Sequence, residues 1–273
     1  MKKSFCLLAH LLPIFIFAQQ HPLPVEPAAL LEAGHAQVDF GIARFNNQPY
    51  PLSGLTGNLW KFGNLKFAIS LSGYVEIQTD GTLLNILKIT KRDTAAYNYD
   101  EVFSNNPTGD IGDFSLWTKF IVLNEYSSGI GISIRFGTQL PNTSNESGLG
   151  IDEMNFFSSF LIQKHFAGVW IANIGLGILG DPVEHSSQHD VLLYALAYTF
   201  PVTESTMFTV QTTGRRGHEG PGIYHLSNGK FGIEKTFDSF TVHFLGITNF
   251  SSSDNSKGVE LTLSYLFRVM DIK

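Results

Sequence analysis

Residues 129–141 read GIGISIRFGTQLP, and this stretch alternates between two kinds of side chain. Its even positions are apolar from Ile130 to Phe136, whereas its odd positions are glycine or polar, including Ser133, Arg135 and Gln139. Successive side chains of a β-strand point to opposite faces, so the stretch predicts a strand with one apolar and one polar face. A tilted strand of about ten residues can cross a bilayer. A soluble sandwich shows the same alternation, so the rest of the chain must decide between the two.

The composition favours a membrane barrel over a soluble domain. Of the 273 residues, 43% are hydrophobic and only 15% are charged, whereas soluble domains average about 25% charged residues. The mean hydropathy of +0.05 is too low for a bundle of membrane helices, but it suits a barrel with a polar interior. The net charge of −6 shows no basic surplus, so nucleic acid is not an expected partner.

The N-terminus has the pattern of a secretory signal peptide. Lys2 and Lys3 precede an apolar run over residues 5–17, and Ala18 offers a cleavage point. The only cysteine, Cys6, lies within this segment, so the mature chain needs no disulfide. We therefore predict a signal peptide over residues 1–18, a Pro- and Ala-rich periplasmic lead or plug over residues 19–34, and a β-barrel over residues 35–273.

Alternation recurs from Ala36 to Arg268 and predicts about twelve strands. Two strands are expected over residues 55–62 and 66–76, joined by a tight FGNL turn, and residues 77–111 are expected to form a long loop. Its LLNILKI stretch could gate the pore or simply cover the surface. Short turns are expected near residues 63–65, 124–128, 166–168, 201–205 and 237–239, and longer polar loops near 46–54, 77–111, 141–153, 180–190, 217–224 and 251–257. Short turns at one end and long loops at the other are typical of an antiparallel up-and-down barrel of the bacterial outer membrane.

The inward face of these strands carries charges of both signs. Such a face can form a hydrophilic lumen that selects solutes, or it can fill a narrow barrel with paired charges. The predicted lumen-lining residues are Asp39, Lys66, Tyr74, Glu76, Trp117, Lys119, Arg135, Gln139, Gln211, Arg215, Lys230, Glu234, Glu260 and Arg268.

Histidines and carboxylates gather in two predicted loops, in types that can bind divalent metals. We interpret them as solvated loop residues and predict no metal or other cofactor. They are Glu184, His185, His189 and Asp190 in one loop and His218 and Glu219 in the other.

Residues 224–228, YHLSN, resemble the His-x-Ser-Asn signature of outer-membrane lipid A deacylases. In that family a histidine base activates a serine on the lipid-facing side. His225 and Ser227 share a predicted face here, but Ser239 stands where the acidic partner is expected, and Glu234 falls on the opposite face. An esterase that uses His225 and Ser227 is therefore the alternative function.

From Gly109 onward the chain resembles the outer-membrane family named for the MetA pathway of phenol degradation. The segments that carry the resemblance are GDIGDFSLWTKFIVLNEYSSGIGISIRFGTQLP (109–141), GLGIDEMNFFSSFLIQKHF (148–166), IANIGLGILGDP (171–182) and VLLYALAYTFPVTESTMFTVQ (191–211). The resemblance implies an outer-membrane channel for hydrophobic or aromatic compounds and supplies no catalytic residues. The chain departs from the family in its predicted long loop and its HLSNGK segment.

Together these patterns predict a non-enzymatic outer-membrane channel that lets a small solute pass. Its partners are membrane lipid and lipopolysaccharide, together with the solute. A barrel with a structural or adhesive role is the third possibility. The sequence leaves the solute and the oligomeric state open.

Overall fold

The structure is a computed structural model that describes residues 23–95, 105–181, 187–217 and 224–270. These residues form thirteen β-strands and two short helices. The strands are β1 (His35–Tyr50), β2 (Leu55–Ser70), β3 (Val75–Arg92), β4 (Thr108–Asp110), β5 (Ser115–Leu123), β6 (Gly131–Gln139), β7 (Asn155–His165), β8 (Val169–Gly180), β9 (Gln188–Thr203), β10 (Thr206–Gly217), β11 (His225–Phe237), β12 (Phe240–Asn249) and β13 (Lys257–Arg268). The helices are α1 (Glu125–Ser128) and the 3-10 turn η1 (Asn145–Ser147).

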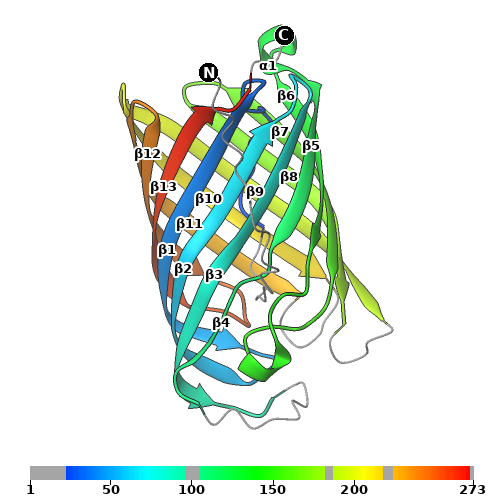
Figure 1. The fold of residues 1–273 in the computed structure, drawn as a ribbon, viewed down its shortest axis with the longest axis vertical. Helices are drawn as coiled ribbons and strands as arrows, with labels where there is room; N and C mark the ends of the chain where they lie inside the picture. The colour runs from blue at the N-terminus through cyan, green and yellow to red at the C-terminus, as the bar shows by residue number, and fades with distance from the viewer. Residues whose placement is uncertain (1–22, 96–104, 182–186, 218–223, 271–273) are drawn as a thin grey trace, which may run out of the picture.

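The strands close into a single antiparallel barrel (Figure 1). Closure is made by β1 and β13, which pair from His35 opposite Arg268 to Asn46 opposite Lys257. β4 and β5 both pair with β3 and are two pieces of one wall strand. The described chain therefore forms twelve wall strands, called staves here. Closure gives every wall strand a hydrogen-bonded neighbour on both sides, which is the condition for a sheet to lie in lipid. The predicted fold class is confirmed.

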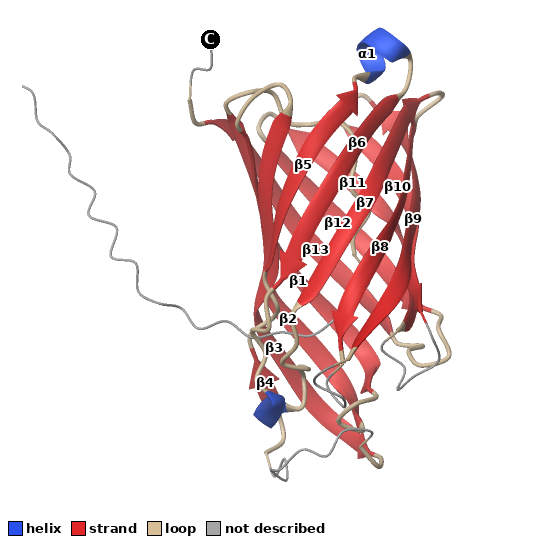
Figure 2. Cartoon of the chain, turned by 90° about the vertical axis from the view of Figure 1, so that its right-hand side faces the viewer, coloured by secondary structure: helices blue, strands red, loops and turns tan. Residues whose placement is uncertain are grey.

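The two ends of the barrel differ, as the sequence predicted. One end, called the turn end here, contains the first residue of β1 and the last residue of β13. It also carries α1 and the connections 71–74, 124–130, 166–168, 204–205 and 238–239 (Figure 2). The opposite loop end carries β4, η1 and the described residues of the connections, which are 51–54, 93–95, 105–107, 140–154, 250–256, Asp181, Ser187 and Tyr224.

The predicted hairpin at the FGNL turn is wrong, because residues 55–70 form the single strand β2. Gly63 has φ +66° and is an extra residue between two register pairs, Gly41 opposite Asn64 and Ile42 opposite Phe62. A β-bulge of this kind reverses the phase of the alternation without reversing the chain. The sequence pattern therefore looked like two strands joined by a turn, and the real turn is 71–74.

The predicted long loop over residues 77–111 is also wrong in its first half, where β3 extends from Val75 to Arg92. The outward positions of this strand include Thr79 and Gly81, which give no apolar signal. The ring of Phe114 lies over Gly81 and supplies the missing apolar surface from the neighbouring stave. Near the loop end, β1 likewise continues to Tyr50 through the segment predicted as a loop from Asn46.

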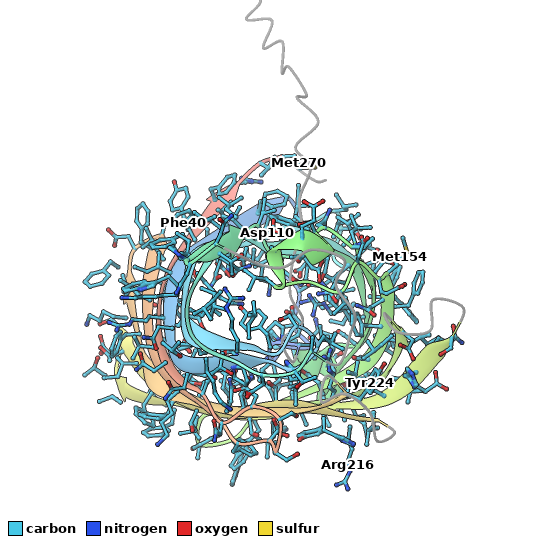
Figure 3. All side chains as sticks on the ribbon, turned by 90° about the horizontal axis from the view of Figure 1, so that it is seen from below. Phe40, Asp110, Met154, Arg216, Tyr224 and Met270 are labelled. Carbon is cyan, nitrogen blue, oxygen red and sulfur yellow. The ribbon has the colours of Figure 1, made fainter. Side chains whose placement is uncertain are left out.

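The two faces of the barrel wall have opposite character (Figure 3). Large apolar side chains project outward around the circumference, as Phe40 does in Figure 3. Inward positions on the same strands are polar or charged, for example Ser133 and Arg135 on β6. This is the arrangement of a transmembrane barrel, with the apolar face toward lipid. Separately, no helix among the described residues is long and apolar enough to cross a membrane.

Toward the loop end the interior contains two apolar clusters in addition to polar groups. Leu149 and Ile151, from the connection 140–154, fold inward and are buried among wall residues such as Leu59 and Phe157. The loop end is therefore partly filled by the protein's own side chains.

Candidate functional site: the barrel lumen

Residues 23–34, called the N-terminal segment here, lie inside the barrel. The segment reaches the wall at the turn end, where the Gly34 N–H donates to the Ser70 carbonyl. At its other end, Leu23 packs against an apolar cluster that includes Trp117 and Phe157. The sequence left a periplasmic lead and a plug as alternatives for residues 19–34, and the described part of this stretch occupies the lumen.

Glu26 is the charged anchor of the N-terminal segment. Its carboxylate accepts hydrogen bonds from Lys119 and Lys66, each at 2.8 Å, and from the Gln78 amide at 2.7 Å. Lys119 also lies 2.9 Å from Glu76, so two carboxylates and two ammonium groups form one network. Buried charges are tolerated only when they are paired and hydrogen-bonded, and this network meets both conditions.

The wall also binds the main chain of the N-terminal segment. The Asn173 amide donates to the Glu26 carbonyl at 2.8 Å and accepts from the Glu26 N–H at 2.9 Å. Ser133 donates to the Ala28 carbonyl, and the Leu31 N–H donates to Glu76 at 2.7 Å. Because these groups come from β3, β6 and β8, the segment is held in one conformation by several staves.

A second inward cluster surrounds Trp117. The Arg135 guanidinium lies 3.8 Å from the centre of the Trp117 ring, and the indole N–H donates to Asp80 at 2.7 Å. Gly137 makes room for this ring, because a Cβ there would lie 1.9 Å from a ring atom. Cation–π contacts gain strength when they are removed from water, and both side chains are buried. Trp117 is thereby fixed in the lumen.

Beside the N-terminal segment the lumen contains a cavity of about 370 Å³, called the chamber here. Most of the residues that line it are polar or charged, including Lys61, Asp113 and the Lys230–Glu260 ion pair at 2.8 Å. Small-molecule sites commonly have about 300–1,000 Å³ and a few precisely placed polar groups. The chamber is therefore large enough for a small solute.

The structure places most of the predicted lumen residues on the inner wall. Residues in the Glu26 network or the Trp117 cluster are Lys66, Glu76, Trp117, Lys119 and Arg135. Asp39, Gln139, Gln211, Lys230 and Glu260 line the chamber, Arg215 is buried in β10, and Glu234 lies 3.9 Å from His243.

Two predicted lumen residues lie elsewhere. Tyr74 is 73% exposed in the turn 71–74, directly before the first residue of β3. The strand predicted over residues 66–76 is therefore wrong. Arg268 is exposed at the last position of β13.

Several groups that face the lumen were not predicted from the sequence. Gln78 and Asp80 lie in the stretch that was predicted as a loop, and Glu26 lies in a segment without periodicity. Lys61 stands between Trp60 and Phe62, both of which face outward. These flanking aromatic residues were the signal that could have identified Lys61 as inward-facing.

His225 and Ser227 do not form a connected pair in the described residues. Both lie on β11 in phase with the outward-facing Phe231, as predicted. The Ser227 hydroxyl is 2.7 Å from the hydroxyl of Tyr194 on β9, rather than bonded to the His225 ring. Glu234 faces the lumen near His243 and is not available to orient His225.

The candidate metal residues of the loops are only partly described. Glu184, His185, His218 and Glu219 lie outside the described residues. The His189 ring is 2.7 Å from the Asp181 carboxylate. Among the described residues, no group of three or more potential metal ligands occurs together.

With this geometry in place, comparison with known proteins supports the fold. No protein-family model and no curated protein matches the chain. Among solved structures, the NanC porin is similar with a TM-score of 0.53 and 9% identity, over 85% of this chain and all of that one. LpxR from Salmonella typhimurium has a TM-score of 0.48 and 7% identity, over 85% of this chain and 100% of that one. The CymD monoaromatic hydrocarbon channel has a TM-score of 0.42 and 8% identity, over 88% and 90% of the two chains. The chain thus has the fold of outer-membrane β-barrels.

Proposed function

We propose that this protein is an outer-membrane channel through which a small solute passes, and that the N-terminal segment obstructs it until the segment moves. The observation that carries the proposal is the chamber, a cavity with charged walls inside a barrel whose outer face is apolar. Charged groups are costly beside lipid but useful along an aqueous path. The combination fits a pore better than a purely structural barrel.

The N-terminal segment is the proposed gate of this channel. The residues that bind its main chain and Glu26 come from β2, β3, β5, β6 and β8, which lie on one half of the wall, so the segment lies along that half and narrows the lumen. Free passage of a solute then requires that these bonds break or that the segment shifts. We therefore expect low conductance with the segment in place and higher conductance without it.

Single-channel recording in planar bilayers tests this. Protein refolded without residues 1–18 is compared with a variant that also lacks residues 19–33, and both are checked for heat-modifiable migration in gels as evidence of a closed barrel. We expect rare, small openings from the first protein and steady, larger currents from the second. A folded, heat-modifiable deletion variant that stays electrically silent would contradict the channel.

The nature of the solute follows from the family resemblance, which implies hydrophobic or aromatic compounds. The apolar side of the chamber, formed by Ala43, Phe45 and Ile247, supports a solute with an apolar body. We place the protein in the MetA-pathway-like group of transporters as part of the same proposal. The esterase alternative has less support, because the Ser227 hydroxyl is paired with Tyr194 and not with a histidine base.

A further inference from the structure

Seven charged side chains line the chamber, and six of them have protein partners. The four carboxylates are each hydrogen-bonded: Asp39 by Gln37, Asp80 by Trp117, Asp113 by the Asn142 N–H and Glu260 by Lys230. Lys66 is paired with Glu26. Among these seven side chains, only the Lys61 ammonium forms no hydrogen bond or ion pair with the described residues. Lys61 therefore lines the chamber with no described acceptor within hydrogen-bonding distance of its ammonium group.

The register of the wall explains why Lys61 is left without a partner. Along one ring of inward positions, Lys61 on β2 is followed by Ala43 on β1 and then by Glu260 on β13. The small side chain of Ala43 leaves space between the ammonium and the carboxylate, and Lys230 approaches Glu260 from the other side at 2.8 Å. On the other side of Lys61 the ring continues to Asp110, which accepts from the Ser144 hydroxyl at 3.1 Å, so both acids of the ring are already hydrogen-bonded.

One further feature shows what could fill this space. Ala43, Phe45 and Ile247 give the same chamber an apolar side. An ammonium group with free donors next to an apolar wall matches a molecule that has an anionic oxygen group on an apolar body.

We propose that Lys61 is a solute-binding residue of the channel and that it takes the carboxylate of a small organic acid whose apolar body lies against Ala43, Phe45 and Ile247. This inference rests on the proposed channel function and narrows its solute class to anionic compounds. It concerns binding, so it can be tested without transport.

Equilibrium titration of the folded protein in detergent measures binding directly. The probe is benzoate, compared with acetate, which lacks the apolar body, and with benzamide, which lacks the charge. The test variant is Lys61→Met, which keeps an unbranched side chain, one atom shorter, and removes the ammonium group. The matched control is Lys88→Met, which removes a lysine of β3 from the exposed side of the wall.

We expect wild type and Lys88→Met to bind benzoate more tightly than acetate or benzamide. Lys61→Met should weaken benzoate binding about tenfold to a hundredfold, as expected for one charge-assisted hydrogen bond, and leave benzamide unchanged. Equal benzoate affinities for all three folded proteins would overturn the assignment, as would a wild type that does not bind benzoate.

The proposed channel function and the proposed binding site can be contradicted independently. A barrel that conducts but does not bind benzoate would contradict the binding site and support the channel. A barrel that does not conduct but binds benzoate through Lys61 would contradict the channel and support the binding site.

Discussion

Glu26 and Lys119 meet inside the barrel at 2.8 Å, and both side chains are only 2% exposed. Glu26 belongs to the N-terminal segment and Lys119 to β5, so this ion pair fastens the segment to the wall. Removing one partner of a buried pair leaves the other charge without compensation and typically costs about 3–5 kcal/mol. The pair is therefore the point at which the placement of the segment is most sensitive to mutation.

Glu26→Gln should release the N-terminal segment while the barrel stays closed. The neutral amide no longer compensates Lys119 and Lys66, so the free energy that holds the segment should fall by about 3–5 kcal/mol. Hydrogen exchange should show faster exchange at residues 26–31, and bilayer recordings should show larger currents than wild type.

Glu32→Gln is the matched control for this substitution. Glu32 is in the same segment, but its side chain is 88% exposed, so both readouts should equal those of wild type. Unchanged exchange in Glu26→Gln would mean that the main-chain bonds alone hold the segment.

Phe160→Arg should destabilise the barrel in a bilayer. Phe160 is on β7, projects outward and is 54% exposed, with Ile134 and Ile174 beside it in register. An arginine on the lipid face near the bilayer midplane costs about 2–4 kcal/mol. Denaturant unfolding from liposomes measures the free energy of unfolding.

Tyr126→Arg is the control for the lipid face, because Tyr126 is fully exposed in α1 at the turn end. We expect its free energy of unfolding to match that of wild type. Equal values for both arginine variants would argue against a lipid-covered surface at Phe160.

Strand periodicity was sufficient to predict the closed barrel, its antiparallel order and its two unlike ends. It failed at β2 and β3, where Gly63 shifts the phase and Gly81 leaves the apolar position to Phe114. The expected number of strands was nevertheless right, because splitting β2 into two strands offset the loss of β3. Local alternation cannot distinguish a bulge from a turn, since both interrupt the pattern at a glycine.

The lumen was predictable wherever a strand was recognised, since Lys119 and Arg135 follow directly from the period of two. Glu26 was not predictable, because its partners Lys66, Gln78 and Lys119 are distant in sequence and the segment has no periodicity. Which inward charges are paired is likewise decided by register between staves. Lys61 stands out only once Ala43 is known to separate it from Glu260.

Gly137→Ala should displace Trp117 and loosen the cluster around it. The new Cβ would lie 1.9 Å from the Trp117 ring, so the ring must leave its place beneath Arg135. Overpacking of this kind typically costs about 1–3 kcal/mol. Thermal unfolding followed by tryptophan fluorescence should show a lower midpoint and an altered native spectrum.

Gly73→Ala is the control for added volume, because a Cβ at Gly73 has no atom within 4 Å. Its midpoint should stay within error of the wild-type value. If Gly137→Ala also left the midpoint and spectrum unchanged, Trp117 would not occupy the tight position described.

Ser227→Ala separates the channel from the esterase alternative. In the structure Ser227 shares a hydrogen bond with Tyr194 on the outer face, so its loss should cost only about 0.5–1.5 kcal/mol of stability. Conductance should be unchanged, because Ser227 points away from the lumen.

The acyl chains of lipopolysaccharide, measured by mass spectrometry after incubation with refolded protein, should be the same for wild type, Ser227→Ala and a protein-free sample. Release of fatty acid by wild type that disappears in Ser227→Ala would instead identify a hydrolase, because a serine nucleophile is indispensable to that chemistry, whereas its hydroxyl contributes little to a pore.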